Sequence, residues 1–184
     1  MPETYQPAED SYLLSEVLKK EVPKLLEKNP EMKSLEIGSG SGINLKTALK
    51  GGMKKRNILG TDINPLAVEH CKKLGFNCVE SDLFENIKKR QFDLIVFNPP
   101  YLPLDKKEPK SSRLETTGGK KGNEIVIRFL EKAKEYLSEN GIIFLITSSL
   151  SEDINFEELG YVSKILGSKK LFFEGLFVWE LMEK

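Results

Sequence analysis

The sequence is poor in the residues that build metal centres and disulfide frameworks. Its 184 residues include two cysteines, Cys71 and Cys78, and one histidine, His70. Neither cysteine has a spacing typical of zinc ligands, so we expect no metal site within this chain and no structural disulfide. The 28 basic and 28 acidic residues cancel, which leaves no overall positive field to favour nucleic acid.

Long apolar runs are also missing. No stretch approaches the roughly 20 residues that span a bilayer, and the N-terminus has no signal-peptide pattern, so we expect a cytoplasmic protein. The composition that is present, 39% hydrophobic and 30% charged residues, is ordinary for a globular protein. The length fits one domain over residues 1–184, with a helical segment over residues 1–30.

Hydrophobic periodicity predicts strands and helices that alternate to the end of the chain. We expect a break in the first helix at Pro23, an N-cap at Asn64, and a long substrate-side loop over residues 102–122. This alternation predicts a doubly wound, mostly parallel α/β sheet. The expected helices are 9–28, 43–50, one from Pro65, 124–137 and 152–158; the expected strands are 33–37, 57–61, 77–80, 92–97, 141–147, 161–168 and 171–181.

The most informative motif is Asn98-Pro99-Pro100-Tyr101, directly after the apolar run 92–97. It puts a carboxamide, a rigid diproline and an aromatic ring at the carboxyl end of a buried strand, where open α/β sheets bind ligands. The Asn98 side-chain oxygen, the Pro99 carbonyl and the Tyr101 ring together suit a planar group that ends in NH2. An ordinary Asn-Pro turn is the alternative.

A second group of motifs follows three consecutive predicted strands. Glu36-Ile37-Gly38-Ser39-Gly40-Ser41-Gly42 has glycine at every second position and no lysine for phosphate. Asp62 could accept from both hydroxyls of a ribose, and Asp82 from the amine of an adenine. A nucleoside cofactor without phosphates, S-adenosylmethionine, fits this set. The alternatives are helix N-caps for the two aspartates and an ordinary strand-end charge for Glu36.

Together these motifs resemble class I S-adenosylmethionine-dependent methyltransferases, and more narrowly the HemK family, which methylates the side-chain nitrogen of a glutamine. The opening segment, residues 5–14, is similar to the short archaeal and eukaryotic members, which lack an N-terminal helical domain. The resemblance implies one methyltransferase domain with a Rossmann-like sheet of seven strands, mostly parallel with an antiparallel C-terminal strand. It also implies a class I translation release factor as substrate, methylated in its Gly-Gly-Gln motif, and a small zinc-binding activator as a possible heterodimer partner.

The resemblance also implies roles for individual residues. The segment 118–122 matches a glycine-rich part of the family near the substrate entrance, although Glu115-Thr116-Thr117 stands where relatives often have an aromatic residue. Glu9 and Asp10 are expected to close over the cofactor, or else to cap the first helix. The expected catalytic residues are Asn98, Pro99, Pro100 and Tyr101; the expected cofactor-binding residues are Tyr5, Pro7, Glu9, Asp10, Glu36, Gly38, Gly40, Gly42, Asp62, Ile63, Asp82, Leu83 and Asn98.

Other functions stay open at the level of the motifs. Asn-Pro-Pro-Tyr is shared with adenine-N6 methyltransferases, and the lysines of loop 105–121 would suit DNA or RNA, whereas the zero net charge argues against nucleic acid. Methylation of another protein side chain, such as lysine, is a further alternative. A catalytically silent binding module is disfavoured, because a scaffold has no need for this motif at a strand end.

Overall fold

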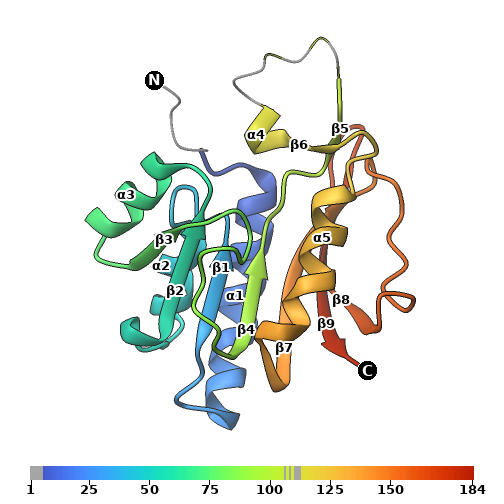
Figure 1. Cartoon of the computed structure of the whole chain (residues 1–184). Helices are drawn as coiled ribbons and strands as arrows, with labels where there is room; N and C mark the ends of the chain where they lie inside the picture. The colour runs from blue at the N-terminus through green and yellow to red at the C-terminus, as the bar shows by residue number, and fades with distance from the viewer. Residues whose placement is uncertain (1–5, 106, 108, 110–112) are drawn as a thin grey trace.

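Seven strands form one sheet in the order β3-β2-β1-β4-β7-β9-β8 in the computed structural model (Figure 1). The structure describes residues 6–105, 107, 109 and 113–184. The strands of this sheet are β1 (Ser34–Ile37), β2 (Ile58–Asp62), β3 (Asn77–Glu80), β4 (Phe92–Phe97), β7 (Leu137–Ser148), β8 (Tyr161–Lys170) and β9 (Gly175–Glu183).

Most strands of the sheet run in the same direction. Strands β1, β2, β3, β4 and β7 pair in parallel, so their carboxyl ends meet at the same edge. Strand β9 runs antiparallel between β7 and β8. The expected mostly parallel sheet of seven strands with an antiparallel C-terminal strand is therefore confirmed.

Helices cover both faces of the sheet. On one face lie α1 (Glu9–Lys28), α2 (Ile43–Lys50) and α3 (Pro65–Lys73), and on the other lies α5 (Glu124–Ala133). Successive residues of β4 alternate between the two apolar cores, because side chains along a strand point to opposite faces. Leu94 and Val96 join the core under α1, whereas Ile95 and Phe97 join the core under α5. This is the doubly wound arrangement.

The expected break at Pro23 is wrong, because α1 runs unbroken through it. Proline removes one backbone donor, and its cost falls when solvent can reach the carbonyl that is left unpaired. Pro23 is exposed, while Leu18 and Val22 are fully buried on the opposite side of the helix. Apolar packing thus holds the helix together on both sides of the proline.

Residues 152–155 have no regular structure and residues 156–158 lie in a turn, so the expected short helix there is also wrong. Ile154 and Phe156 both pack on the core under α5, an alternation that a helix does not allow. The Asn155 side chain accepts a hydrogen bond from the Glu158 backbone N–H at 3.2 Å, which caps a single turn that ends at Gly160, where φ is 79°. Further along, β9 begins at Gly175, and residues 171–174 form a turn.

Regular structure is present within the expected loop 102–122. Strand β5 (Leu102–Pro103) pairs in parallel with β6 (Thr117–Gly119), and α4 (Arg113–Thr116) precedes β6. Two short 3-10 helices, η1 (Lys55–Asn57) and η2 (Lys134–Tyr136), complete the elements of the described residues, and η2 replaces the last turn expected of α5. Within the described ranges, no helix has the length and apolar character that crossing a membrane requires.

Candidate functional site

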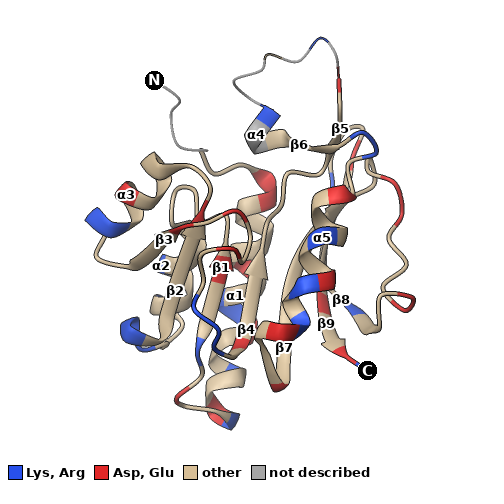
Figure 2. Cartoon of the chain, viewed as in Figure 1, with Lys and Arg blue, Asp and Glu red and all other residues tan. Residues whose placement is uncertain are grey.

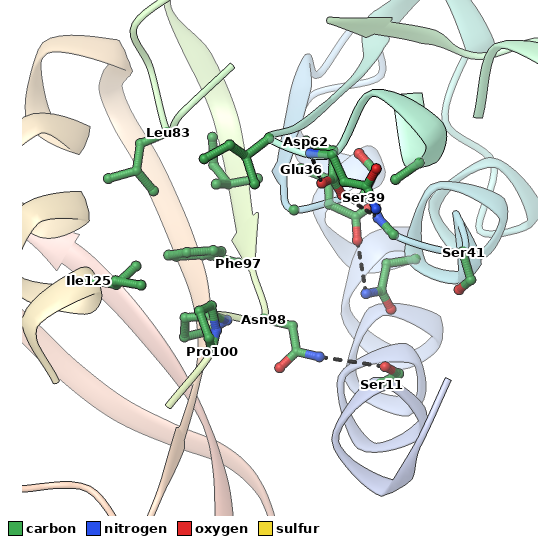
Figure 3. A pocket seen from close by; sticks show the side chains of 18 of the residues that line it. Ser11, Glu36, Ser39, Ser41, Asp62, Leu83, Phe97, Asn98, Pro100 and Ile125 are labelled. Carbon is green, nitrogen blue, oxygen red and sulfur yellow. Dashed lines mark hydrogen bonds between the residues drawn. The ribbon is translucent and has the colours of Figure 1, made fainter. Parts of the chain in front are cut away.

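A pocket of about 160 Å³ opens at the edge where the parallel strands end (Figure 3). Its polar side carries Glu36, Ser39 and Asp62, and its apolar side carries Leu83, Phe97 and Ile125. The structure brings together here many of the residues that the sequence singled out. They are Asp10, Glu36, Gly38, Gly40, Asp62, Ile63, Asp82, Leu83, Asn98, Pro99 and Pro100.

The glycine loop after β1 is held against the end of β2. The Gly40 backbone N–H donates to the Asp62 carboxylate at 2.8 Å, and the Asn64 N–H donates to its other oxygen at 2.8 Å. Gly38 and Gly40 have φ angles of 67° and 47°, in the left-handed region that favours glycine. Burial raises the pKa of Asp62. The loop and the acid are thus positioned as one unit.

Glu36 is a buried acid with one oxygen unpaired. The Asn44 side-chain N–H2 donates to Oε1 at 2.9 Å, whereas Oε2 has no hydrogen-bond partner among the described residues. Burial is the main reason that the pKa of Glu36 is raised to about 8. The strand-end position therefore holds a desolvated carboxyl rather than an ordinary surface charge.

Three buried oxygens of the pocket wall are unpaired acceptors. The buried oxygens Glu36 Oε2, Asn44 Oδ1 and Asn98 Oδ1 all lack a hydrogen-bond partner in the described part of the chain. A buried acceptor left unpaired costs about 1–3 kcal/mol. A guest that brings N–H groups would remove that cost, so the wall is suited to donors such as an ammonium or an amide.

The start of α1 is tied to the Asn98 motif. The Asn98 side-chain N–H2 donates to the Ser11 hydroxyl at 3.5 Å, and that hydroxyl donates to Asp10 at 3.2 Å. The Tyr101 hydroxyl donates to the other Asp10 oxygen at 3.2 Å. The N-cap of α1 is Ala8, which makes no side-chain capping bond. Asp10 therefore acts mainly as an acceptor that joins two elements of the pocket.

Asp82 and Leu83 form a strained corner after β3. Leu83 has a φ of 47°, and it is the one described residue other than glycine with a positive φ. The Ser81 hydroxyl donates to the Leu83 carbonyl at 3.0 Å, which helps to hold this conformation. One Asp82 oxygen accepts from Arg128 of α5 at 3.0 Å. The carboxylate that was expected to meet an adenine amine thus already has a cationic partner.

Some predicted residues lie elsewhere. The Tyr101 ring packs on the core under α1 rather than lining the pocket. Glu9 is exposed and pairs with Lys169 of β8, and Pro7 does not line the pocket. Gly42 is the N-cap of α2 and faces α3, where an added Cβ would lie 3.3 Å from Cys71 Sγ. Tyr5 lies outside the described residues.

The pocket also contains residues that the sequence did not reveal. Asn44 had a usable signal, since it is a polar residue in the first turn of the helix after the glycine loop. Ile125 had none, because it reaches the pocket from the first turn of α5, far along the chain. The lining residues that had no assigned role were Ser11, Ile37, Ser39, Ser41, Ile43, Asn44, Asn64, Ala67, Ser81, Phe97 and Ile125, although Ile37, Ser39 and Ser41 belong to the glycine motif.

The chain shares its sequence pattern with proteins already described. The family model described as methyltransferase small domain matches residues 11–162. A candidate protein N5-glutamine methyltransferase of Methanocaldococcus jannaschii is 42% identical over 195 aligned positions, which cover 98% of this chain and 93% of that protein. The human protein named methyltransferase HEMK2 is 33% identical over 178 positions, which cover 90% of this chain and 79% of that protein.

A solved structure shares the fold over the whole chain. It is the E. cuniculi Mtq2–Trm112 complex, described as responsible for the methylation of the eRF1 translation termination factor. The matching chain is 28% identical, has a TM-score of 0.72, and is covered in full, as is the present chain.

Proposed function

This chain belongs to the methyltransferase small domain family, and from that premise we propose that it methylates a glutamine side chain of a translation release factor, with S-adenosylmethionine as methyl donor. The names of its relatives support this substrate: one is named as a candidate protein N5-glutamine methyltransferase, and another belongs to a complex described as responsible for the methylation of eRF1. Residues 1–184 would work as one methyltransferase domain with residues 102–122 on the substrate side. A release factor as substrate also implies a cytoplasmic location.

One observation carries the proposal: Asn98 presents a buried, unpaired amide oxygen at the end of β4. Ser11 accepts from the other end of the same amide. Since the Ser11 hydroxyl donates to Asp10, its oxygen is left to accept, and this fixes which end of the Asn98 amide it binds. The arrangement leaves Oδ1 as the end available to an N–H2 group of a substrate.

The residues that line the pocket fit the proposed cofactor. None of the described residues that line it is a lysine or arginine, which suits a nucleoside without phosphates. The unpaired Glu36 Oε2 suits the methionine ammonium, Asp62 suits the ribose hydroxyls, and Leu83 and Ile125 provide an apolar side for a purine. When bound, S-adenosylmethionine supplies an electrophilic methyl group on its sulfonium.

The protein's part in the reaction is orientation. An amide nitrogen is a poor nucleophile, because its lone pair is delocalised into the carbonyl. Asn98 Oδ1 and the Pro99 carbonyl would each accept one N–H of the substrate amide, which aims the nitrogen and favours positive charge developing on it. The two prolines fix the backbone φ angles at this point, so the acceptors are held before the substrate arrives.

A labelling assay tests the function. The chain is incubated with labelled S-adenosylmethionine and either purified release factor, release factor with the Gly-Gly-Gln glutamine replaced by alanine, or nucleic acid. We expect label on the intact release factor alone. Label on nucleic acid alone would instead identify an adenine methyltransferase, and label on both release factors would indicate another side chain.

The assay should include a small activator subunit. The E. cuniculi protein was solved as a complex with Trm112, and we propose a partner of that kind for this chain. Each reaction is therefore run with and without a zinc-binding candidate from the same organism. Absence of label with every candidate would count against the proposed substrate.

A further inference from the structure

Two neighbouring aromatic side chains stand exposed on the turn between β8 and β9. Phe172 is 93% exposed and Phe173 is 86% exposed, whereas Val162, the next most exposed large hydrophobic residue among those described, is 51% exposed. Their ring centroids lie 5.0 Å apart with the planes at 68°, an edge-on contact that aromatic pairs prefer. Exposed apolar groups gathered in one place usually mark a binding surface.

The turn that carries the pair is anchored on both sides. The Leu171 N–H donates to the Glu174 carbonyl at 2.7 Å, which closes the turn. The Ser148 hydroxyl donates to the Glu174 carboxylate at 2.6 Å, and the Gly175 N–H donates to the Ser149 hydroxyl at 2.8 Å. The phenylalanines are therefore held out by a fixed turn rather than by a loose end.

The turn lies at the same edge of the sheet as the pocket. Ser148, at the carboxyl end of β7, pairs with Leu176 at the start of β9, and β7 is parallel to β4, which ends beside Asn98. Lys169, three residues before Phe172, pairs with Glu9, whose neighbour Asp10 lines the pocket. Figure 1 shows the turn between β8 and β9 at the same end of the molecule as β5 and β6.

Basic residues border the aromatic pair. Lys169 and Lys170 come just before the turn, and both are exposed. Lys120 and Lys121 follow β6 at the same edge, where Figure 2 shows basic residues. Among the described ion pairs, Lys170 and Lys120 have no acidic partner. A complementary surface would therefore present an apolar centre with acidic side chains around it.

We propose that Phe172 and Phe173 dock the body of the protein substrate while its glutamine enters the pocket, an inference that rests on the proposed function. A glutamine side chain is short, so the backbone that carries it must lie at the rim of the pocket. The surface of the substrate beside that backbone must then lie along this edge of the sheet. The aromatic pair is the apolar group that this surface would meet there.

The test compares a folded substrate with a short one. The double variant Phe172→Ser/Phe173→Ser is assayed on intact release factor and on a short peptide that contains the Gly-Gly-Gln sequence, with the activator present in every reaction. Truncation of an aromatic residue at the centre of an interface commonly lowers the affinity more than tenfold. We therefore expect kcat/KM to fall about tenfold or more for the protein, with kcat/KM for the peptide and the Kd of the cofactor unchanged.

A matched control lies on the same strand. The double variant Val162→Ser/Ile165→Ser removes two exposed apolar residues of β8 that lie farther from the turn, and it should leave both substrates unaffected. Equal losses on protein and peptide in the phenylalanine variant, or no loss on either, would overturn the docking role. So would loss of activator binding or of binding to lipid vesicles as the only effect. A wild-type protein that methylates neither substrate would refute the proposed function itself.

Discussion

Asn98 and Asp62 lie in the same pocket, but their hydrogen-bond partners indicate different roles. The Asn98 oxygen is unpaired, whereas the Asp62 carboxylate holds the glycine loop. We expect Asn98→Ala to lower methyl transfer about 100-fold or more and to leave the cofactor Kd nearly unchanged. Asp62→Ala should instead weaken cofactor binding by about tenfold or more. Titration calorimetry and single-turnover labelling separate the two, and an unchanged Kd in the Asp62 variant would contradict the ribose assignment.

Ser11 orients Asn98 without reaching the substrate itself. Its hydroxyl donates to Asp10 and accepts from Asn98, so Ser11→Ala frees the amide to turn over and present its N–H2 to the pocket. We expect kcat to fall several-fold while the cofactor Kd is kept. Ser11→Thr retains the hydroxyl and should restore kcat. A wild-type kcat for the alanine variant would show that the amide is fixed by other contacts.

Glu36 links stability to pH. Burial raises its pKa from 4.5 to about 8, so the folded state keeps a proton that the unfolded chain releases. Stability of the cofactor-free protein should therefore fall as pH rises from about 4.5 towards 8, by on the order of a few kcal/mol.

Urea unfolding across that pH range measures the effect. Glu36→Gln stays neutral at every pH and should flatten the slope, though not abolish it, since the pKa of Asp62 is raised in the same direction. A bound ammonium favours the charged carboxylate, so the cofactor should also reduce the slope. The same pH dependence in the glutamine variant would place its origin elsewhere.

Sequence reasoning works at residue scale where the signal is local. Asp62, Asp82 and Asn98 each follow a recognisable strand, and all three line the pocket. Ser11 and Tyr101 could not be placed in this way, because their partners come from segments 87 and 91 residues away. Tyr101 was expected to stack on the substrate, yet its hydroxyl has a partner on α1 that no local pattern reveals.

At the scale of elements, strands were predicted well and breaks poorly. Strands β3 and β4 have the expected bounds. Strand β4 is a nearly continuous apolar run, as buried parallel strands are, whereas β3 is a partly exposed edge strand whose bounds are marked by the turn residues on either side. The break expected at Pro23 and the helix expected over residues 152–158 were wrong, because neither depends on a local signal alone. In both cases, packing against the core decides the backbone conformation, and the cores only exist once distant strands have met.

The β5–β6 pair gives a prediction at this scale. A Cβ added to Gly118 would lie 2.6 Å from the Pro100 carbonyl and 2.3 Å from the Gly122 carbonyl, so β6 packs backbone to backbone against the Asn98 motif. Gly118→Ala should push the motif out of place, at a cost of about 1–3 kcal/mol, and lower kcat while the cofactor still binds. The exposed neighbour Lys120→Ala is the control, assayed on the short peptide. Equal kcat values would show that the motif does not depend on β6.

For the whole molecule, the pocket joins segments from residue 10 to residue 125. A cofactor bound there should therefore stabilise the entire fold. At a concentration 100 times its Kd, S-adenosylhomocysteine should add about 2.7 kcal/mol, which raises Tm by roughly 5–11 °C in a chain of this length. Asn98→Ala should keep the shift. ATP should give none, because no lysine or arginine is among the described residues that line the pocket. A Tm that is independent of S-adenosylhomocysteine would refute the cofactor assignment.

The docking of α1 against the last strands has a consequence for synthesis on the ribosome. Gly167 of β8 is so close to α1 that an added Cβ would lie 3.0 Å from Val17, and Lys169 holds Glu9 at the helix start. The first helix can therefore complete its docking only after β8 has left the exit tunnel. Asp10 and Ser11 belong to that helix, so a nascent chain that already has its glycine loop and both strand-end acids still lacks one wall of its pocket. A chain truncated before β8 should therefore be inactive.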